Sequence, residues 1–273
     1  VLDEQLEEAC RKYSAMGISG FKVDFLDRDD QTAVEMACRI AEMTAKYRLT
    51  LDLHGFYKPT GMNRTYPNVI NYESVFGMEE MKWSTVDRDM MEYDVTMPYI
   101  RMMAGPVDYT PGAMRNAAKR DFKPIYHNPM SQGTRCHQLA AYVVHDSPLT
   151  MLADNPTIYR KEQECTDFIV GMPNKGIDET RILQGKLGEF IVTARRTGSA
   201  WYVGGMTDWT PRNVTLDFSF LGEGTYDVIL FRDGINADRQ AEDYVKEAFS
   251  VTSASRKNIW LAPGGFAMSV VKR

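Results

Sequence analysis

Several chemical signatures are missing from this sequence. Its four cysteines, Cys10, Cys38, Cys136 and Cys165, form no C-x-x-C pair and no Cys/His cluster at zinc-binding spacing, so we expect free and mostly buried thiols. The sequence also contains no H-x-x-x-H, G-x-S-x-G, G-x-G-x-x-G or P-loop motif. Zinc proteolysis, serine hydrolysis and nucleotide chemistry therefore lack support.

Positive charge and long apolar runs are also scarce. Lysine and arginine number 32 against 37 acidic residues, and the net charge is -5. Nucleic acids and anionic membranes bind basic surfaces, so we expect neither and favour a neutral or polar small molecule. No apolar run reaches the roughly 18 residues of a membrane span. The N-terminus has no signal-peptide pattern and begins inside an amphipathic helix pattern, so we expect further sequence upstream.

The first part of the chain alternates helix and strand patterns. This β-α-β order predicts a parallel sheet with right-handed crossovers, and the spacing of the strands fits a (β/α)8 barrel. A complete barrel needs about 250 residues and only about 175 precede a change in the pattern, so we expect five or six units and an incomplete barrel. Helices are predicted at 2–16, 31–46 with Asp30 or Asp29 as N-cap, and 133–145, and strands at 21–25, 49–53, 69–72, 95–102 and 149–152.

The pattern changes at a Pro- and Gly-containing segment over 171–176. From Glu179 onward, short alternating runs are separated by Gly, Asn or Asp, which is typical of an antiparallel β-sandwich. We therefore predict two domains: a partial (β/α) barrel over 1–175, and a β-sandwich over 176–273.

Polar residues follow the first three expected strands of the barrel: Asp24, His54 with Gly55, and Glu73, with Glu79 shortly after. The carboxyl ends of barrel strands form the face where catalytic residues gather. A charged side chain such as Asp24 is costly there unless it is paired or used, and we favour a functional role. Paired carboxylates suit glycoside hydrolysis, in which one protonates the leaving oxygen and the other attacks the sugar or activates water.

Glu73 and Glu79 lie six residues apart across Gly77. Two such carboxylates repel each other at close range, and a hard cation with oxygen ligands, such as calcium, would remove that cost. Glu79 could equally open a helix at its favourable N-terminal end, so the pattern leaves both interpretations open. His54 is the best site candidate among the histidines. Aromatic residues could stack on sugar rings, although most barrel aromatics are core: Phe56, Tyr57, Tyr66, Tyr72 and Trp83.

Four ordered motifs resemble glycoside hydrolase family 97, whose members are α-glucosidases and α-galactosidases typical of gut Bacteroidetes. The motifs are G-F-K-V-D-F-L-D-R-D-D-Q at 20–31, L-D-L-H-G at 51–55, N-Y-E-S-V-F-G-M-E at 71–79 and S-P-L-T-M-L-A-D at 147–154. The resemblance implies that the strand before Asp24 is the fourth of the barrel. It also implies an N-terminal β-sandwich upstream that completes the site, and a periplasmic or secreted location.

The resemblance further implies roles for particular residues. Retaining α-galactosidases of this family carry an Asp nucleophile that matches Asp24 and a Glu acid/base that matches Glu79. Glu73 and Glu79 match two ligands of a calcium ion, and His54 and Tyr57 are expected to bind substrate. The inverting α-glucosidases of the family use a glutamate as the base. One candidate position for this glutamate is the end of the second expected strand, where this sequence has His54 and Gly55.

We therefore expect a retaining, exo-acting α-galactosidase that uses Ca²⁺ and acts on small oligosaccharides with a terminal α-linked sugar. The nearest alternative is an inverting α-glucosidase of the same family. A non-catalytic carbohydrate-binding protein is the alternative from another class.

Overall fold

The computed structural model describes residues 2–173 and 176–273, which form two compact units. The first unit comprises the chain up to Gly77, together with Arg101–Tyr109 and Asp146–Thr150. The second unit comprises Met78–Ile100, Thr110–His145 and Met151–Arg273. The domain border expected at 175 falls on Asn174 and Lys175, which lie outside the described residues. The division into a barrel domain and a β domain thus stays a prediction.

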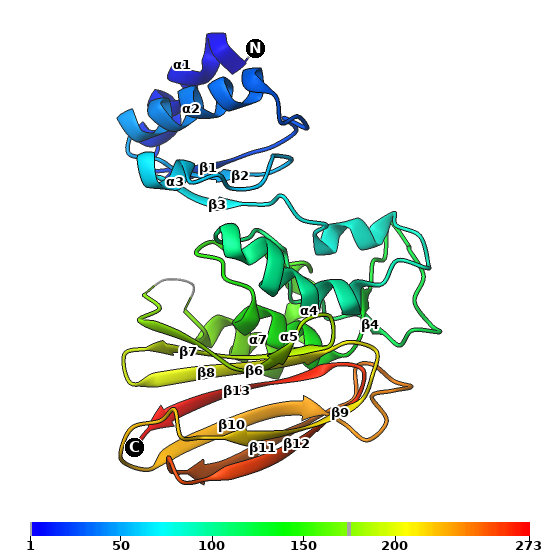
Figure 1. Cartoon of the computed structure of the whole chain (residues 1–273). Helices are drawn as coiled ribbons and strands as arrows, with labels where there is room; N and C mark the ends of the chain where they lie inside the picture. Colours follow the sequence, from blue (N-terminus) through cyan, green and yellow to red (C-terminus); the bar gives the residue numbers. More distant parts are fainter. Residues whose placement is uncertain (1, 174–175) are drawn as a thin grey trace. The chain divides into compact units, whose positions relative to one another are not determined.

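The first unit is built on three parallel strands with two helices packed on one face (Figure 1). The strands lie in the order β1-β2-β3, as the β-α-β pattern predicts. Asp30 is the N-cap of α2, and its side chain accepts a hydrogen bond from the Ala33 backbone N–H at 3.0 Å. The elements are α1 (Leu2–Ala15), β1 (Gly20–Val23), α2 (Gln31–Lys46), β2 (Thr50–Leu53), α3 (Met62–Thr65), β3 (Val69–Tyr72) and the 3-10 helix η2 (Arg101–Ala104).

The two faces of this sheet differ in polarity. Leu51 and Leu53 of β2 pack with Ile40 of α2 in the apolar core of the unit. Since successive strand residues face opposite sides, Asp52 points to the other face. Lys22 of β1 is its register partner, and Asn71 of β3 is its partner on the other side. A polar layer therefore lies directly below the strand ends that carry the candidate site.

The second unit begins with short helices and two strand fragments. One predicted element is correct here: α5 (Arg135–Val144) begins with Thr134 as N-cap, whose hydroxyl accepts from the His137 N–H at 3.1 Å. The remaining elements are η1 (Met78–Lys82), α4 (Met90–Ile100), β4 (Asn116–Ala117), β5 (Ser131–Gln132), α6 (Pro156–Lys161) and α7 (Gln163–Gly171).

Two predicted strands are wrong. Residues 95–100 belong to α4, and 149–152 form no regular element. The Val95–Ile100 run is apolar on most sides, and periodicity cannot distinguish a buried helix from a buried strand in so short a run. Residues 147–150 instead run beside the sheet of the first unit, where the Asn71 amide donates to the Ser147 hydroxyl at 3.0 Å and the Leu149 carbonyl at 3.1 Å.

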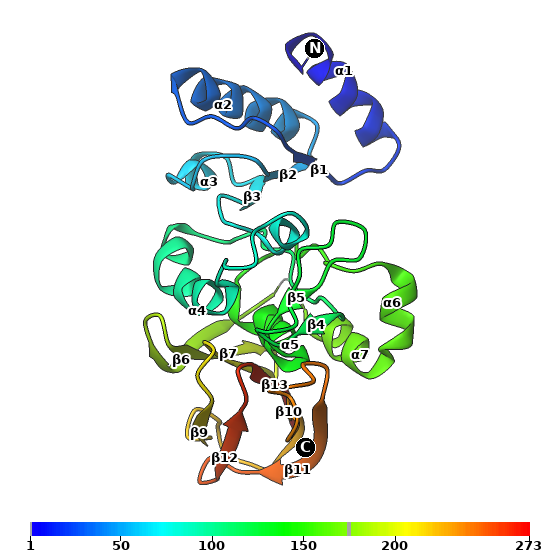
Figure 2. The same cartoon turned by 90° about the vertical axis from the view of Figure 1, so that its right-hand side faces the viewer.

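The C-terminal part forms an antiparallel β domain with a six-stranded sheet in the order β11-β10-β13-β8-β7-β6 and a two-stranded sheet β12-β9 (Figures 1 and 2). The alternating runs after Glu179 predict this arrangement. The strands are β6 (Glu179–Lys186), β7 (Phe190–Thr197), β8 (Ala200–Thr207), β9 (Arg212–Asp217), β10 (Tyr226–Asp233), β11 (Tyr244–Val251), β12 (Arg256–Leu261) and β13 (Gly265–Lys272).

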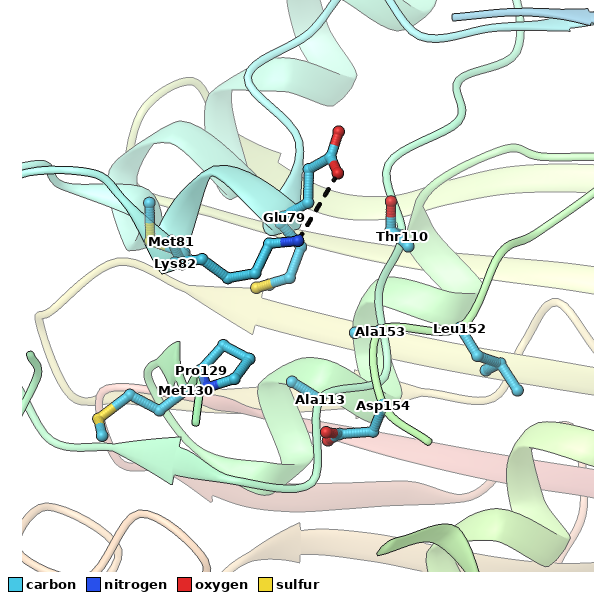
Figure 3. A pocket seen from close by; sticks show the side chains of 11 residues that line it. Glu79, Met81, Lys82, Thr110, Ala113, Pro129, Met130, Leu152, Ala153 and Asp154 are labelled. Atoms are coloured by element: carbon cyan, nitrogen blue, oxygen red, sulfur yellow. Dashed lines mark ion pairs between the residues drawn. The ribbon is translucent and has the colours of Figure 1, made fainter. Parts of the chain in front are cut away.

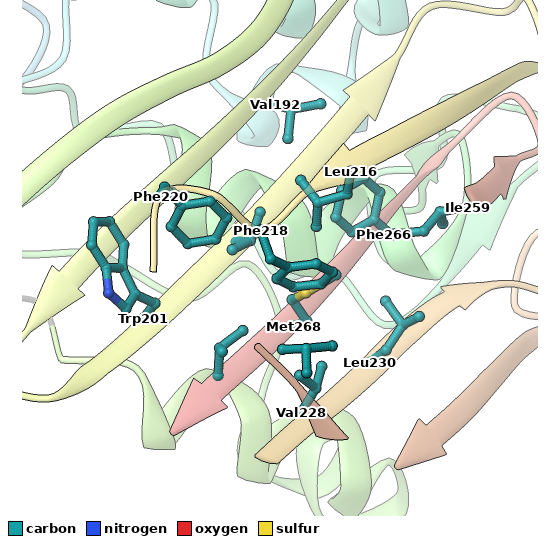
Figure 4. Close-up of a cluster of buried hydrophobic side chains, with 14 of the residues drawn as sticks. Val192, Trp201, Leu216, Phe218, Phe220, Val228, Leu230, Ile259, Phe266 and Met268 are labelled. Atoms are coloured by element: carbon teal, nitrogen blue, oxygen red, sulfur yellow. The ribbon is translucent and has the colours of Figure 1, made fainter. Parts of the chain in front are cut away.

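The inner strands β7, β8 and β13 of the six-stranded sheet are buried on both faces over most of their length, whereas the edge strands β6 and β11 are largely exposed. On one face, Phe266 and Met268 of β13 join Leu216 of β9 and Ile259 of β12 in the core between the two sheets (Figure 4). On the other face, Ala267 belongs to a second core with residues of α5 and α7. Strands covered on both sides lose the clean apolar-polar alternation of a half-exposed sheet.

Helix α5 approaches the sheet closely because β8 has a glycine at the contact. A Cβ at Gly204 would lie 2.8 Å from both the Ala140 carbonyl oxygen and the Val143 Cβ. Such distances are well inside van der Waals contact, so any side chain would force the helix away from the sheet. None of the described helices is both long and apolar enough to cross a membrane.

Candidate active site

Asp24 lies immediately after β1, at the carboxyl end of the parallel sheet. Its carboxylate accepts a hydrogen bond from the Phe25 backbone N–H at 2.6 Å. Phe25 and Asp27 adopt positive φ angles of 63° and 45°, which non-glycine residues seldom do, and the Phe25 side chain is exposed. This strained backbone holds a half-buried carboxylate above the sheet, a feature that clusters at functional sites.

The imidazole of His54 connects the candidate carboxylates. Its Nδ1 lies 3.2 Å from Asp24 Oδ1, and its Nε2 lies 3.1 Å from Glu73 Oε1. The side chain is buried, with 8% of its surface exposed. A doubly protonated ring could donate to both carboxylates, whereas a neutral ring could donate to one. The three residues that the sequence places at neighbouring strand ends are thus in direct contact.

Gly55 allows this contact to form. Its φ angle is 53°, and a Cβ there would lie 2.7 Å from Asp24 Oδ1 and 2.9 Å from the Phe25 nitrogen. Its backbone N–H donates to Glu73 Oε2 at 2.7 Å, and its carbonyl accepts from the Asp27 N–H at 2.8 Å. The residue after His54 therefore has to be a glycine, because a side chain would collide with the Asp24 carboxylate.

Glu73 is buried and firmly oriented. Its backbone N–H donates to the Leu53 carbonyl at 2.8 Å, which continues the pairing of β3 with β2. The guanidinium of Arg101 donates to the Glu73 carbonyl at 3.1 Å and the Tyr72 carbonyl at 3.2 Å. Arg101 was not predicted as a site residue; it begins η2, inside the 95–102 run that the sequence predicts as a strand.

A fully buried carboxylate, Asp108, lies beneath the site and was also missed. Its Oδ2 accepts from Lys22 Nζ at 2.7 Å and lies 3.8 Å from His54 Nε2. Its backbone N–H donates to the Tyr72 carbonyl at 2.8 Å, which holds this segment beside the end of β3. The signal available in the sequence was an acid between apolar neighbours in Val107-Asp108-Tyr109.

Asp52, next to this group, is held in its protonated form. Burial, and then the negative charge of Asp108, raise the pKa of Asp52 to about 8, although the nearby charge of Lys22 opposes the shift. Protonated, the carboxyl can donate a hydrogen bond to Asp108, which favours that form further. The polar layer therefore contains Lys22 balanced by Asp108, with a neutral Asp52 beside them.

Replacing Asp52 by asparagine should flatten the pH dependence of stability. The pKa is raised in the folded state from 3.8 to about 8, so the folded protein retains a proton that the unfolded chain releases across this window. Stability therefore falls with rising pH, by at most about 1.4 kcal/mol per pH unit from this group. Thermal melts from pH 5 to 8 should show an Asp52→Asn variant gaining melting temperature relative to the parent as pH rises. A difference in melting temperature between variant and parent that stays the same from pH 5 to 8 would contradict the raised pKa of Asp52.

Tyr57 remains a predicted substrate contact. Its ring packs against Phe56 with a centroid distance of 4.0 Å, and both rings lie against the apolar core of the first unit. Partial burial raises the pKa of Tyr57, so the hydroxyl stays protonated and can act as a hydrogen-bond donor.

Glu79 belongs to the second unit, where it lies on η1 and lines a pocket of about 220 Å³ (Figure 3). Lys82 Nζ lies 4.0 Å from its carboxylate. Glu79 lies in the first turn of η1, which begins at Met78, as the interpretation of Glu79 as a helix-start residue expects. The other lining residues are Met78, Met81, Thr110, Ala113, Pro129, Met130, Leu152, Ala153 and Asp154.

Comparison with known proteins agrees with the motifs. The sequence model of glycoside hydrolase 97 matches residues 1–75, and that of the glycosyl-hydrolase 97 C-terminal, oligomerisation region matches 176–271. A retaining alpha-galactosidase from Bacteroides thetaiotaomicron is 54% identical over 269 residues, which are 98% of this chain and 40% of that protein. The chain belongs to glycoside hydrolase family 97.

Two further proteins resemble this chain over nearly its whole length. A probable retaining alpha-galactosidase from Streptomyces bingchenggensis is 29% identical over 97% of this chain and 38% of its own length. A family 97 enzyme from Pseudoalteromonas, solved in complex with acarbose, is 28% identical and superposes with a TM-score of 0.87 over all of this chain and 45% of its own. The chain thus spans about two fifths of the curated relatives it matches.

These likenesses confirm the predicted fold class, a barrel of the TIM type followed by an antiparallel β domain. A noncanonic maltogenic alpha-amylase from Thermotoga neapolitana, 15% identical with a TM-score of 0.53 over all of this chain and 66% of its own, shares the fold alone.

Proposed function

We propose that the chain is the catalytic part of a retaining, exo-acting α-galactosidase that hydrolyses terminal α-galactosides. Asp24 attacks the anomeric carbon and forms a covalent glycosyl-enzyme. Glu79 first protonates the leaving oxygen and then, as a carboxylate, deprotonates the water that releases the sugar. The observation that carries the proposal is the Asp24 carboxylate, held by His54 and strained backbone at a strand end.

The neighbours of Asp24 support the role of nucleophile. His54 Nδ1 at 3.2 Å and the Phe25 N–H at 2.6 Å can stabilise the ionised carboxylate that attacks the sugar. The strand after α2, β2, is followed by His54 and Gly55, so this strand end offers no glutamate to act as the base of an inverting enzyme. The 54% identity to a retaining alpha-galactosidase favours the same mechanism.

The stereochemistry of the first product tests this proposal. Proton NMR during early hydrolysis of an aryl α-galactoside should show the α-anomer of galactose before mutarotation. First appearance of the β-anomer would establish inversion. Release of glucose but no galactose from matched aryl glycosides would favour the α-glucosidase alternative, and binding without hydrolysis of either would favour a carbohydrate-binding protein.

We propose that calcium binds beside the acid/base, with Glu73 and Glu79 among its ligands. The chemistry of the donors fits: calcium prefers carboxylate oxygens, and Glu73 offers a buried, oriented carboxylate close to His54. Since calcium takes six to eight oxygen ligands, further ligands are required, and the family resemblance assigns some to an N-terminal domain. When bound, the ion supplies positive charge that stabilises neighbouring carboxylates.

Removal of calcium should therefore reduce activity. Dialysis against EGTA is expected to lower kcat/KM, and calcium should restore it at a concentration that rises by at least about tenfold in a Glu73→Gln variant. Activity that is unchanged in protein verified as calcium-free by atomic emission would overturn the metal assignment. A small oligosaccharide with a terminal α-linked sugar is the proposed substrate, and a periplasmic or secreted location the proposed compartment.

A further inference from the structure

Two large aromatic side chains near Glu79 are exposed side by side. Trp83 has 49% and Tyr126 has 60% of its surface accessible, and their ring centroids are 6.0 Å apart with an interplanar angle of 32°. They come from separate parts of the second unit: Trp83 directly follows η1, and Tyr126 lies in the loop between β4 and β5. Their exposure excludes a role in the hydrophobic core.

Polar contacts give this aromatic pair a defined orientation. The indole Nε1–H of Trp83 donates to Glu80 Oε2 at 2.5 Å. The ring of His127 packs edge-on against Tyr126 with a centroid distance of 5.2 Å. Solvent-exposed rings are usually mobile, but here a hydrogen bond and an edge contact hold both rings in place. Such preorganised rings lose little entropy when a ligand packs against them.

Lys82 connects the aromatic pair to Glu79. Its Nζ lies 4.7 Å from the centroid of Trp83 and 5.8 Å from that of Tyr126, and it is 4.0 Å from the Glu79 carboxylate. Both Glu79 and Lys82 also line the pocket in Figure 3, together with the polar residues Thr110 and Asp154. Lys82 thus contacts the aromatic pair and also lines the pocket, so the pair and the pocket lie next to each other beside Glu79.

This surface has the chemistry of a sugar site. A pyranose presents an apolar face of C–H groups and an edge of hydroxyls, so it is bound by an aromatic ring together with charged or amide groups. The pocket volume of about 220 Å³ is below the roughly 300–1,000 Å³ of sites for drug-sized ligands, and suits one sugar ring.

We propose that Trp83 and Tyr126, with Lys82, form the leaving-group subsite, which binds the sugar released in the first step. The inference rests on the proposed function, in which Glu79 protonates the oxygen that joins the two sugars. The leaving sugar is bonded to that oxygen, and Lys82 and Trp83 continue the short helix that carries Glu79. The donor sugar is held instead at Asp24, where the covalent bond forms.

The test compares two substrates of the intact enzyme: an α-galactosyl oligosaccharide, and α-galactosyl fluoride, which has no leaving sugar. A Trp83→Ala variant should lose about tenfold in kcat/KM for the oligosaccharide, as expected from loss of an aromatic contact, and change by less than about twofold for the fluoride. Trp83→Phe should recover most of the loss. Ile235→Ala, which removes another exposed apolar side chain, in the β domain, is the control and should alter neither value.

The outcomes separate the subsite from the function on which it rests. If the parent enzyme hydrolyses both substrates but Trp83→Ala leaves oligosaccharide cleavage unchanged, the subsite is wrong and the function stands. An equal loss on both substrates would place Trp83 at the donor sugar or in the fold, and would also overturn the proposal. A parent enzyme inactive on both substrates would refute the proposed function together with the subsite.

Discussion

Replacing Asp24 by glycine is expected to lower kcat by about 10⁴-fold or more, because it removes the proposed nucleophile that forms the glycosyl-enzyme. Added azide should then restore part of the activity by occupying the space left by the carboxylate. Since azide attacks the opposite face of the α-galactoside in a single displacement, the product should be β-galactosyl azide, identified by proton NMR.

A matched control for this experiment is Asp29→Asn, which alters an exposed carboxylate in the loop after β1. It should retain activity close to that of the parent. If azide fails to rescue Asp24→Gly in protein with an unchanged melting temperature, Asp24 is not the nucleophile. An α-galactosyl azide product would lead to the same conclusion, because it requires a second displacement.

Replacing Glu79 by glutamine should produce the second large effect, and its size should depend on the leaving group. The amide cannot donate a proton as an acid does, so kcat/KM for an α-galactosyl oligosaccharide is expected to fall by about 10²- to 10⁴-fold. α-Galactosyl fluoride needs little protonation of its leaving group, so its first step should be much less affected.

The pH profile of the same variant provides a further readout. The parent should show a bell-shaped dependence of kcat/KM, and Glu79→Gln should lose the limb that reports the acid. Glu92→Gln, on the exposed side of α4, is the control and should leave the profile unchanged. An equal loss for both substrates would assign Glu79 a structural or metal-binding role alone.

Much of the first unit could be predicted because its signals are local. Helix α2 begins after Asp30 as the capping pattern indicates, and strands β1 to β3 coincide with runs of β-branched and aromatic residues. Once these strands are parallel neighbours, their carboxyl ends share one edge. That geometry brings Asp24, His54 and Glu73 together without any knowledge of their contacts.

The polar residues beneath the site are harder to predict than the strand ends. Asp108 enters from a segment without periodicity, more than thirty residues after Glu73, and its position depends on a backbone hydrogen bond to Tyr72. Lys22 and Asp52 do follow the two-residue alternation, so their common face could be inferred. Their charge state could not, because it depends on burial and on the distance to Asp108.

The sequence also predicts too many strands. The run over 95–102 contains Val95 and Ile100, which favour strands, and Pro98, which disfavours a helix interior. The structure nevertheless places Pro98 in the last turn of α4. Packing of Val95 with Ala140 and Val144 of α5 outweighs the intrinsic preference of the run.

The glycine contact between α5 and β8 has a consequence for how such enzymes could recombine. The helix precedes the β domain in sequence, yet Cys136, Leu139 and Val143 share a core with Phe231 and Ala267 of the six-stranded sheet. A chimera joined near residue 175 would separate a helix from the surface to which it is fitted. An exchange of domains between related enzymes would therefore preserve this interface only if α5 and the six-stranded sheet came from the same parent protein.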